Sequence, residues 1–139
     1  TLRLTLLRRD NFNAHGFDVG MFSILKPGGE EHLSLVPLLT EAGERSTLST
    51  REGADCLLRD FRVRRAAPPA TLTLIVAERP LGDDFAAEER VVFTTYALRH
   101  NDAQGVGQPY FYFEPLSTQE SKAKYCDVGA AFSRELGMP

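Results

Sequence analysis

The segments TLTLIVAE, residues 71–78, and RVVFTTYALR, residues 90–99, are the two strongest β-strand signals in the chain. Both are rich in β-branched and aromatic residues, which favour extended backbone. The nearly continuous apolar stretch of residues 71–78 is typical of a strand at the centre of a sheet. An acidic surface loop is expected between them, over residues 80–89. These two segments predict a mainly β fold.

Further strands are predicted towards the N-terminus. Residues 1–6 alternate apolar and polar side chains with a period of two, which indicates a half-buried strand. A polar loop at residues 10–16 precedes a second strand, 17–25. The turn sequence KPGGE, residues 26–30, then predicts a hairpin to a third strand at 32–39.

The middle of the chain is less clear. The polar, glycine-containing residues 40–54 are predicted to form a long loop. Residues 56–63 fit neither the helical nor the strand period cleanly, and a strand is only slightly preferred.

The C-terminal part is expected to contain a short strand and a helix. Residues 110–114 carry four consecutive aromatic side chains, and Pro115 is expected to stop that strand. A final helix is predicted over residues 127–136, with Asp127 as its N-cap and Gly137 at its end. The expected architecture is one β-rich domain over residues 1–139: an antiparallel β-sandwich or curved sheet of six to seven strands with one C-terminal helix.

The composition suits a soluble globular protein, with 42% hydrophobic and 25% charged residues. The net charge of −3 arises from 16 basic and 19 acidic side chains that are well mixed along the chain. Since no basic patch dominates, we expect no nucleic-acid partner. No apolar run reaches the roughly 18 residues that a spanning helix needs, so no membrane span is expected.

The two cysteines, Cys56 and Cys126, are the only thiols. We favour a disulfide between them, because metal or redox chemistry would want closer spacing such as C-x-x-C. Two free buried thiols in a cytosolic protein are the alternative. The chain opens with Thr1, so we expect any signal peptide to lie outside the sequence.

Motifs for catalysis or cofactors are not found. The three histidines lack the spacing of a helical zinc site, and no serine lies in a G-x-S-x-G turn. Glu78 and Glu114 could act as an acid–base pair, but nothing in the sequence places them together. We therefore predict no catalytic residue, no metal, no cofactor and no enzymatic activity.

Three places could instead form a recognition surface. Loop 10–16 offers Asp10, Asn11, Asn13 and His15, although the asparagines could simply bond to their own backbone.

In the strand 110–114, Phe111 and Phe113 are expected to face the core and Tyr110 and Tyr112 the other side. The tyrosines then suit a binding surface, but they could equally lie under the C-terminal helix.

The third place is the acidic loop with Asp83 and Asp84, which we also count as partner-binding. With Glu88 and Glu89 these carboxylates could hold calcium, but a solvated loop is the simpler interpretation.

Residues 9–18, residues 53–61 and the stretch 124–128 leading to Ala131 and Phe132 together resemble a known family. They are similar to the carbapenem intrinsic-resistance proteins of the CarF/CarG type, small exported proteins that protect a carbapenem producer without hydrolysing the drug. The resemblance implies a periplasmic location, and it places both cysteines within recurring motifs. The family's aspartate-rich segment ahead of the first stretch is missing here, so no calcium role is carried over.

The functional prediction is a periplasmic self-protection protein of the immunity type, which neutralises a cell-envelope toxin by binding. The expected partner is a secreted protein effector in a 1:1 complex. The alternative is intrinsic resistance to carbapenem-type β-lactams, by binding the drug or shielding its target. A concave apolar pocket with a few polar groups would indicate drug binding, whereas a flat or convex surface tipped by loops would indicate a protein partner. A hydrolase is the third hypothesis.

Overall fold

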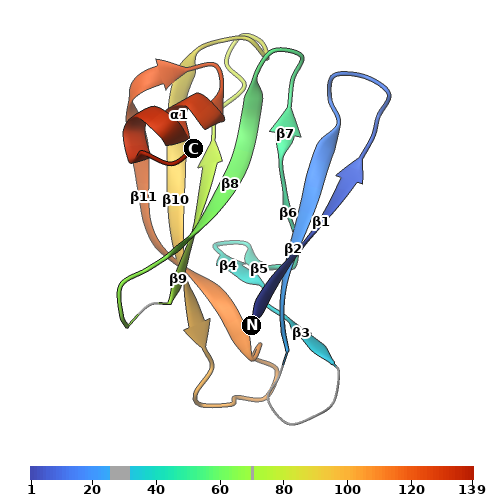
Figure 1. Cartoon of the computed structure of the whole chain (residues 1–139), viewed down its shortest axis with the longest axis vertical. Coiled ribbons are helices and arrows are strands. Elements are labelled where there is room, and N and C mark those ends of the chain that lie inside the picture. The colour runs from blue at the N-terminus through green and yellow to red at the C-terminus, as the bar shows by residue number, and fades with distance from the viewer. Residues whose placement is uncertain (26–31, 70) are drawn as a thin grey trace.

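The computed structural model describes residues 1–25, 32–69 and 71–139, and it contains two β-sheets and one helix (Figure 1). The four-stranded sheet contains β1 (Leu2–Arg9), β2 (Phe17–Leu25), β3 (Leu33–Leu35) and β6 (Leu48–Ser49). The seven-stranded sheet contains β4 (Leu38–Thr40), β5 (Gly43–Arg45), β7 (Arg51–Glu52), β8 (Leu57–Arg65), β9 (Leu72–Glu78), β10 (Glu89–His100) and β11 (Phe111–Tyr125). Helix α1 (Val128–Leu136) follows β11.

The fold class is the predicted one, mainly β with a single C-terminal helix. The seven-stranded sheet has the order β5-β4-β11-β10-β9-β8-β7. Its strand pairs are antiparallel except for β4 and β11, which run parallel. The strong segments 71–78 and 90–99 are β9 and β10, each paired on both sides. The turn predicted at residues 26–30 lies outside the described residues.

The chain crosses from one sheet to the other three times, between β3 and β4, between β5 and β6, and between β6 and β7. Val36 donates its N–H to Phe22 of β2, and the next residue, Pro37, accepts a hydrogen bond from Phe113 of β11. The strand predicted over residues 32–39 is therefore two strands in different sheets. At the third crossing, Thr50 bonds to the backbone of Asp18 through both its N–H and its hydroxyl.

The prediction of a loop over residues 40–54 is wrong in part, because β5, β6 and β7 lie within it. These strands are only two or three residues long, too short to show an alternating pattern. Their existence depends on pairing with β4, β2 and β8. The slight preference for a strand at residues 56–63 is confirmed by β8.

Pro115 does not stop the last strand, which continues to Tyr125. The register between β10 and β11 shifts between Thr95 and Tyr96, directly opposite Pro115. Such a bulge accommodates a residue that has no N–H to donate to the ladder. The long β11 therefore replaces the short strand and the connection that the sequence suggested.

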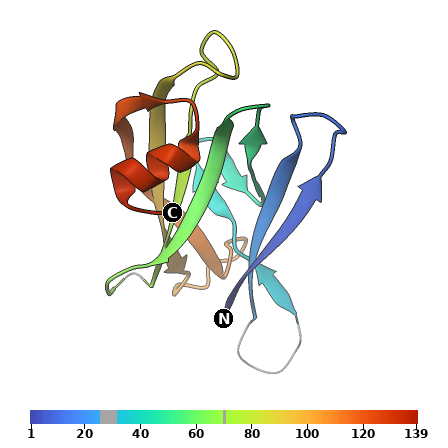
Figure 2. The same ribbon diagram turned by 45° about the horizontal axis from the view of Figure 1, so that its top comes forward.

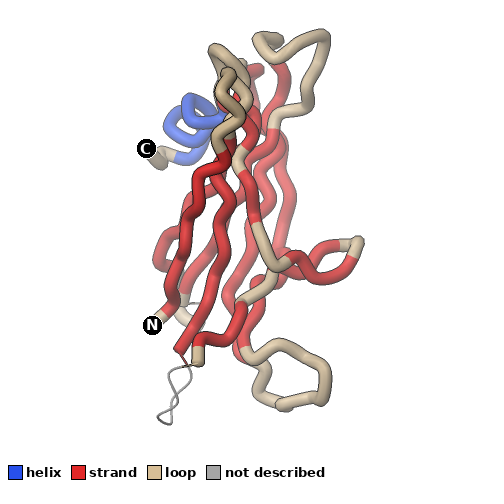
Figure 3. The backbone as a smooth tube through the Cα atoms, turned by 90° about the vertical axis from the view of Figure 1, so that its right-hand side faces the viewer, coloured by secondary structure: helices blue, strands red, loops and turns tan. Residues whose placement is uncertain are grey.

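The core is divided by the seven-stranded sheet. One cluster fills the space between the two sheets, and a second lies under α1 on the opposite face. Strand β9 contributes to both, with Leu74 in the first cluster and Ile75 and Ala77 in the second. This explains its continuous apolar sequence, since both of its faces are buried. Viewed from the side, α1 lies against one end of the long strands (Figure 3).

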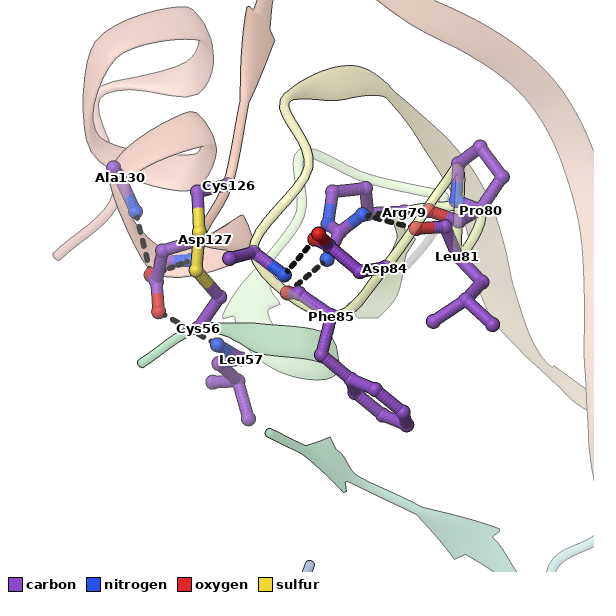
Figure 4. The surroundings of a disulfide bond; sticks show 12 residues. Cys56, Leu57, Arg79, Pro80, Leu81, Asp84, Phe85, Cys126, Asp127 and Ala130 are labelled. Atoms are coloured by element: carbon purple, nitrogen blue, oxygen red, sulfur yellow. Dashed lines mark hydrogen bonds between the residues drawn. A yellow bond between two sulfur atoms is a disulfide. The ribbon is translucent and has the colours of Figure 1, made fainter. Parts of the chain in front are cut away.

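The predicted disulfide is confirmed. Cys56 and Cys126 are bonded, with their Cα atoms 5.6 Å apart (Figure 4). Asp127 is the N-cap of α1, as predicted, and accepts hydrogen bonds from Gly129 and Ala130. Its other carboxylate oxygen accepts the N–H of Leu57 at 2.9 Å. The bridge and the cap together attach the helix to the start of β8.

Gly137 ends the helix with a left-handed backbone at φ 63°, a conformation that glycine adopts without strain. Across the described residues, no helix has the length and apolar character needed to cross a membrane.

Candidate functional site

A cavity of about 400 Å³ lies on the face of the seven-stranded sheet that does not carry the helix. Its floor is formed by β9 and β10, where side chains alternate between the two faces. Val76, Val92 and Thr94 face the cavity, whereas Ile75 and Phe93 pack with α1 on the other side. The walls come from β4, β5, β6 and β8. The lining residues are Leu38, Thr40, Arg45, Leu48, Arg59, Val76, Glu78, Pro80, Val92, Thr94 and Tyr96.

The charged groups of the cavity leave one cation in excess. Arg59 binds Glu78 at 2.6 Å, so these two charges neutralise each other. Arg45, which is exposed at the end of β5, has no ion pair within the part of the chain that the structure describes. The cavity therefore carries a guanidinium that is available to an anion.

Tyr96 adds a hydroxyl group beside this cation. Burial raises the pKa of Tyr96, while the positive charge of Arg45 acts in the opposite direction. The hydroxyl is therefore protonated at neutral pH and can donate a hydrogen bond. An anion with an apolar body is the kind of ligand that this combination of groups suits.

The residues of loop 10–16 that are predicted to bind a partner lie outside the cavity, at the tip of the β1–β2 hairpin. Asn11 donates its side-chain N–H to the backbone carbonyl of His15, and the Asn13 side chain accepts the N–H of His15. The asparagines thus do bond to their own backbone. Between them, Phe12 is fully exposed on a left-handed backbone, at φ 56°.

The acidic loop comes close to this tip. The rings of His15 and Phe85 are 4.6 Å apart, and the loop between β9 and β10 lies at the same end of the molecule as the tip of the β1–β2 hairpin (Figure 2). The Asp84 carboxylate accepts the N–H of Ala86 within its own loop. In the described residues, no three metal-ligating side chains lie close enough together to hold an ion.

The loop is folded around a buried cation, Arg79, whose side chain is 1% exposed. Its guanidinium donates to the carbonyl oxygens of Pro80, Leu81 and Phe85 (Figure 4). The carbonyls that could have faced a bound metal ion are thus turned towards an arginine.

Tyr110 and Tyr112 are not part of this surface. They lie at the start of β11, where Tyr112 pairs with Arg99 and the ring of Tyr110 contacts those of His100 and Phe111. Neither belongs to the cluster under α1. Phe111 and Phe113 face the inter-sheet core, as predicted. The structure therefore brings together six of the eight predicted residues and places the two tyrosines at the other end.

The cavity itself was not predicted as a site. Arg45 and Leu48 lie in the segment 40–54 that is predicted to be a loop. For Glu78, the sequence suggested only an acid–base pair with Glu114. The structure pairs these carboxylates with different arginines, Glu78 with Arg59 and Glu114 with Arg99. Residues far apart in sequence meet here only through the strand order, so no local motif marks them.

Comparison with known proteins finds no matching family model and no matching curated protein. Among solved structures, the crystal structure of CarG is similar, with a TM-score of 0.75 and 19% sequence identity. The similarity covers 98% of this chain and 85% of that chain. The chain therefore has a CarG-type fold, in agreement with the resemblance found in the sequence.

Proposed function

We propose that this protein contributes to resistance against carbapenem-type β-lactams by binding the drug in the inter-sheet cavity. The observation that carries the proposal is the unpaired guanidinium of Arg45 in a largely apolar cavity of about 400 Å³. This volume is within the range of roughly 300–1,000 Å³ that is usual for small-molecule sites. The shared fold with CarG is consistent with the same function.

The carbapenem nucleus combines a carboxylate with a compact apolar bicycle. In the proposed complex the carboxylate binds Arg45, because a guanidinium can donate two parallel hydrogen bonds to it. The ring system lies against Val76, Val92 and Leu38, and the protonated hydroxyl of Tyr96 donates to a carbonyl of the drug. The drug is sequestered and leaves the complex unchanged.

The structure favours this over a protein toxin as the primary ligand, because a concave apolar cavity with a few polar groups is what drug binding requires. The surface that would suit a toxin is the loop end around Phe12. No comparison points specifically to a toxin. The two functions are separable, since Phe12 and Arg45 lie in different parts of the molecule.

The periplasm is the proposed location. A disulfide between Cys56 and Cys126 is expected to persist in an oxidising compartment and to be rare in the cytosol. Fractionation of the native host, with detection of the protein in the osmotic-shock fluid, tests this directly.

The binding proposal is tested by calorimetric titration of the purified protein with meropenem. Loss of a charge-assisted hydrogen bond of about 1.5–3 kcal/mol predicts that Arg45→Met weakens binding roughly 10- to 150-fold. Arg134→Met, an exposed arginine on α1, is the matched control and is expected to bind normally.

The same variants are compared for the inhibitory concentration of the drug in cells that export the protein. Equal affinity of Arg45→Met and the unmodified protein would refute the proposal. Loss of protection in Phe12→Ser, with none in Arg45→Met, would support a protein toxin instead. Recovery of ring-opened drug would indicate a hydrolase.

A further inference from the structure

Strand β1 forms an open edge of the four-stranded sheet. It is eight residues long and pairs with β2 over its whole length, from Leu2 opposite Ile24 to Arg9 opposite Phe17. In the sheet order β1-β2-β3, no strand of the described residues pairs with β1 on its other side. An exposed strand of this length presents a row of backbone groups that another strand can bind.

The side chains of β1 that face the seven-stranded sheet are incompletely covered. Leu4 is 38% exposed and Leu6 is 55% exposed, although both point towards Phe61 across Gly20. A Cβ atom at Gly20 of β2 would lie only 3.1 Å from the ring of Phe61 on β8, so these two strands approach closely there. Beside them runs a groove of about 280 Å³ between β1 and β8, which includes Leu4, Leu6, Phe61 and Val63.

The opposite side of this groove is closed to strand pairing. The N–H of Phe61 donates to the Asp60 carboxylate at 2.8 Å, and its carbonyl accepts from Arg62 at 2.9 Å. Asp60 and Arg62 also form an ion pair with each other. The N–H and the carbonyl of Phe61 are therefore both hydrogen-bonded to side chains and are not free to pair with another strand. Natural sheet edges are commonly protected in comparable ways. The free edge at the groove is that of β1.

The charges on the face of β1 that points away from the groove favour an acidic partner. On the groove side, Asp60 pairs with Arg62, whereas Asp18 at 3.3 Å shares Arg8 with Glu52, which binds it more closely at 2.6 Å. Arg3 and Arg9 are exposed and form no ion pair with any other described residue. By the period of two, they lie on the face of β1 opposite to Leu4 and Leu6.

A second copy of β1 is a poor occupant of this edge. In a symmetric antiparallel pair centred on Leu6, Arg3 would lie opposite Arg9 twice. Like charges directly opposite each other destabilise a strand pair.

We propose that the β1 edge binds an extended segment of a partner protein in which apolar and acidic residues alternate. The segment adds a strand to the sheet. Its apolar side chains enter the groove beside Leu4 and Leu6, and its carboxylates pair with Arg3 and Arg9 on the other face. This site is separate from the cavity with Arg45, so the proposal stands independently of the proposed drug binding.

The test uses a fluorescently labelled synthetic peptide of about eight residues with alternating valine and glutamate, matched to the length of β1. Fluorescence polarisation is expected to show saturable binding to the protein. A peptide with lysine in place of glutamate is expected to bind at least tenfold more weakly. In Leu6→Lys, a charge on the groove face of the edge is expected to weaken binding by at least tenfold.

Leu116→Lys is the matched control, because Leu116 is 50% exposed and lies on β11, outside the groove. It is expected to bind the peptide normally, as is Arg45→Met. Since Leu6 is half exposed, Leu6→Lys should keep its circular dichroism spectrum, and hydrogen exchange of residues 2–9 provides a second measurement. Peptide-dependent protection of these amides supports the proposal.

Equal binding of the two peptides, or no binding of either, would overturn the proposal. A self-associated protein that becomes monomeric in Leu6→Lys would show that a second copy takes the edge.

Discussion

Arg79 directly follows β9, and its replacement is expected to disturb the loop between β9 and β10. Its side chain is 1% exposed, and burial lowers the pKa of its guanidinium. Three carbonyl oxygens accept its N–H groups, those of Pro80 at 2.8 Å, Leu81 at 3.0 Å and Phe85 at 2.5 Å. The Nε atom is buried without a partner. The informative change is Arg79→Met, which keeps the length of the side chain and removes every donor.

Two opposing contributions determine the size of the effect. Each carbonyl that loses its donor costs about 1–3 kcal/mol where water does not replace the bond, so the upper bound for three is roughly 3–9 kcal/mol. Removing a buried cation returns several kcal/mol of desolvation free energy, and water entering the loop replaces part of the lost bonding. We therefore expect the free energy of unfolding to fall by about 3 kcal/mol. Arg79→Lys keeps the charge but not the planar fork, and a loss of about 1–2 kcal/mol is expected.

Urea denaturation followed by circular dichroism measures both variants, with exposed Arg65→Met as the control. Limited proteolysis provides a local measurement, because loop 80–88 should become the first cleavage site in Arg79→Met. An unfolding free energy within about 0.5 kcal/mol of the unmodified protein would refute the reasoning. It would mean that the carbonyls are satisfied by water and that the arginine does not organise the loop.

Three further predictions concern the attachment of the elements to one another. The double variant Cys56→Ser/Cys126→Ser removes a bridge between residues 70 apart, and the chain-entropy model predicts that the free energy of unfolding falls by about 4 kcal/mol. Urea denaturation measures this change, and a fall of less than about 1 kcal/mol would contradict the prediction. Asp127→Ala removes the helix cap and the bond to Leu57, so calorimetry should show a loss of about 2 kcal/mol, with a smaller loss in Asp127→Asn. The hydrogen bond from Arg8 holds the pKa of Glu52 below its ordinary value of 4.5. Its stabilising effect is therefore complete above that value and is lost as the pH falls through the lower folded-state pKa. Glu52→Gln should flatten the acid side of the stability profile, and an unchanged profile would show that the pair is not formed in solution.

Part of the candidate surface could be predicted from local sequence. Asn11, Asn13 and His15 form a hydrogen-bonded turn because asparagine side chains reach backbone groups a few residues away. That a second loop lies against this turn, through Phe85, was not predictable from either segment. The cavity was out of reach for the same reason, since Arg45, Arg59 and Tyr96 belong to three strands that are not consecutive in the chain.

Elements with a local cause could be predicted from the amino-acid sequence alone. Alternation and β-branched residues define β1, β9 and β10, and Asp127 and Gly137 define the ends of α1. The spacing of Cys56 and Cys126 and the absence of a metal motif favoured the disulfide. Tertiary structure decided the rest: the crossings between sheets at Pro37 and Thr50, the parallel pair of β4 and β11, and the continuation of β11 past Pro115. The physical reason is that a strand pattern specifies which face of a strand is buried but not which partner satisfies its backbone, and that choice depends on how the whole chain packs.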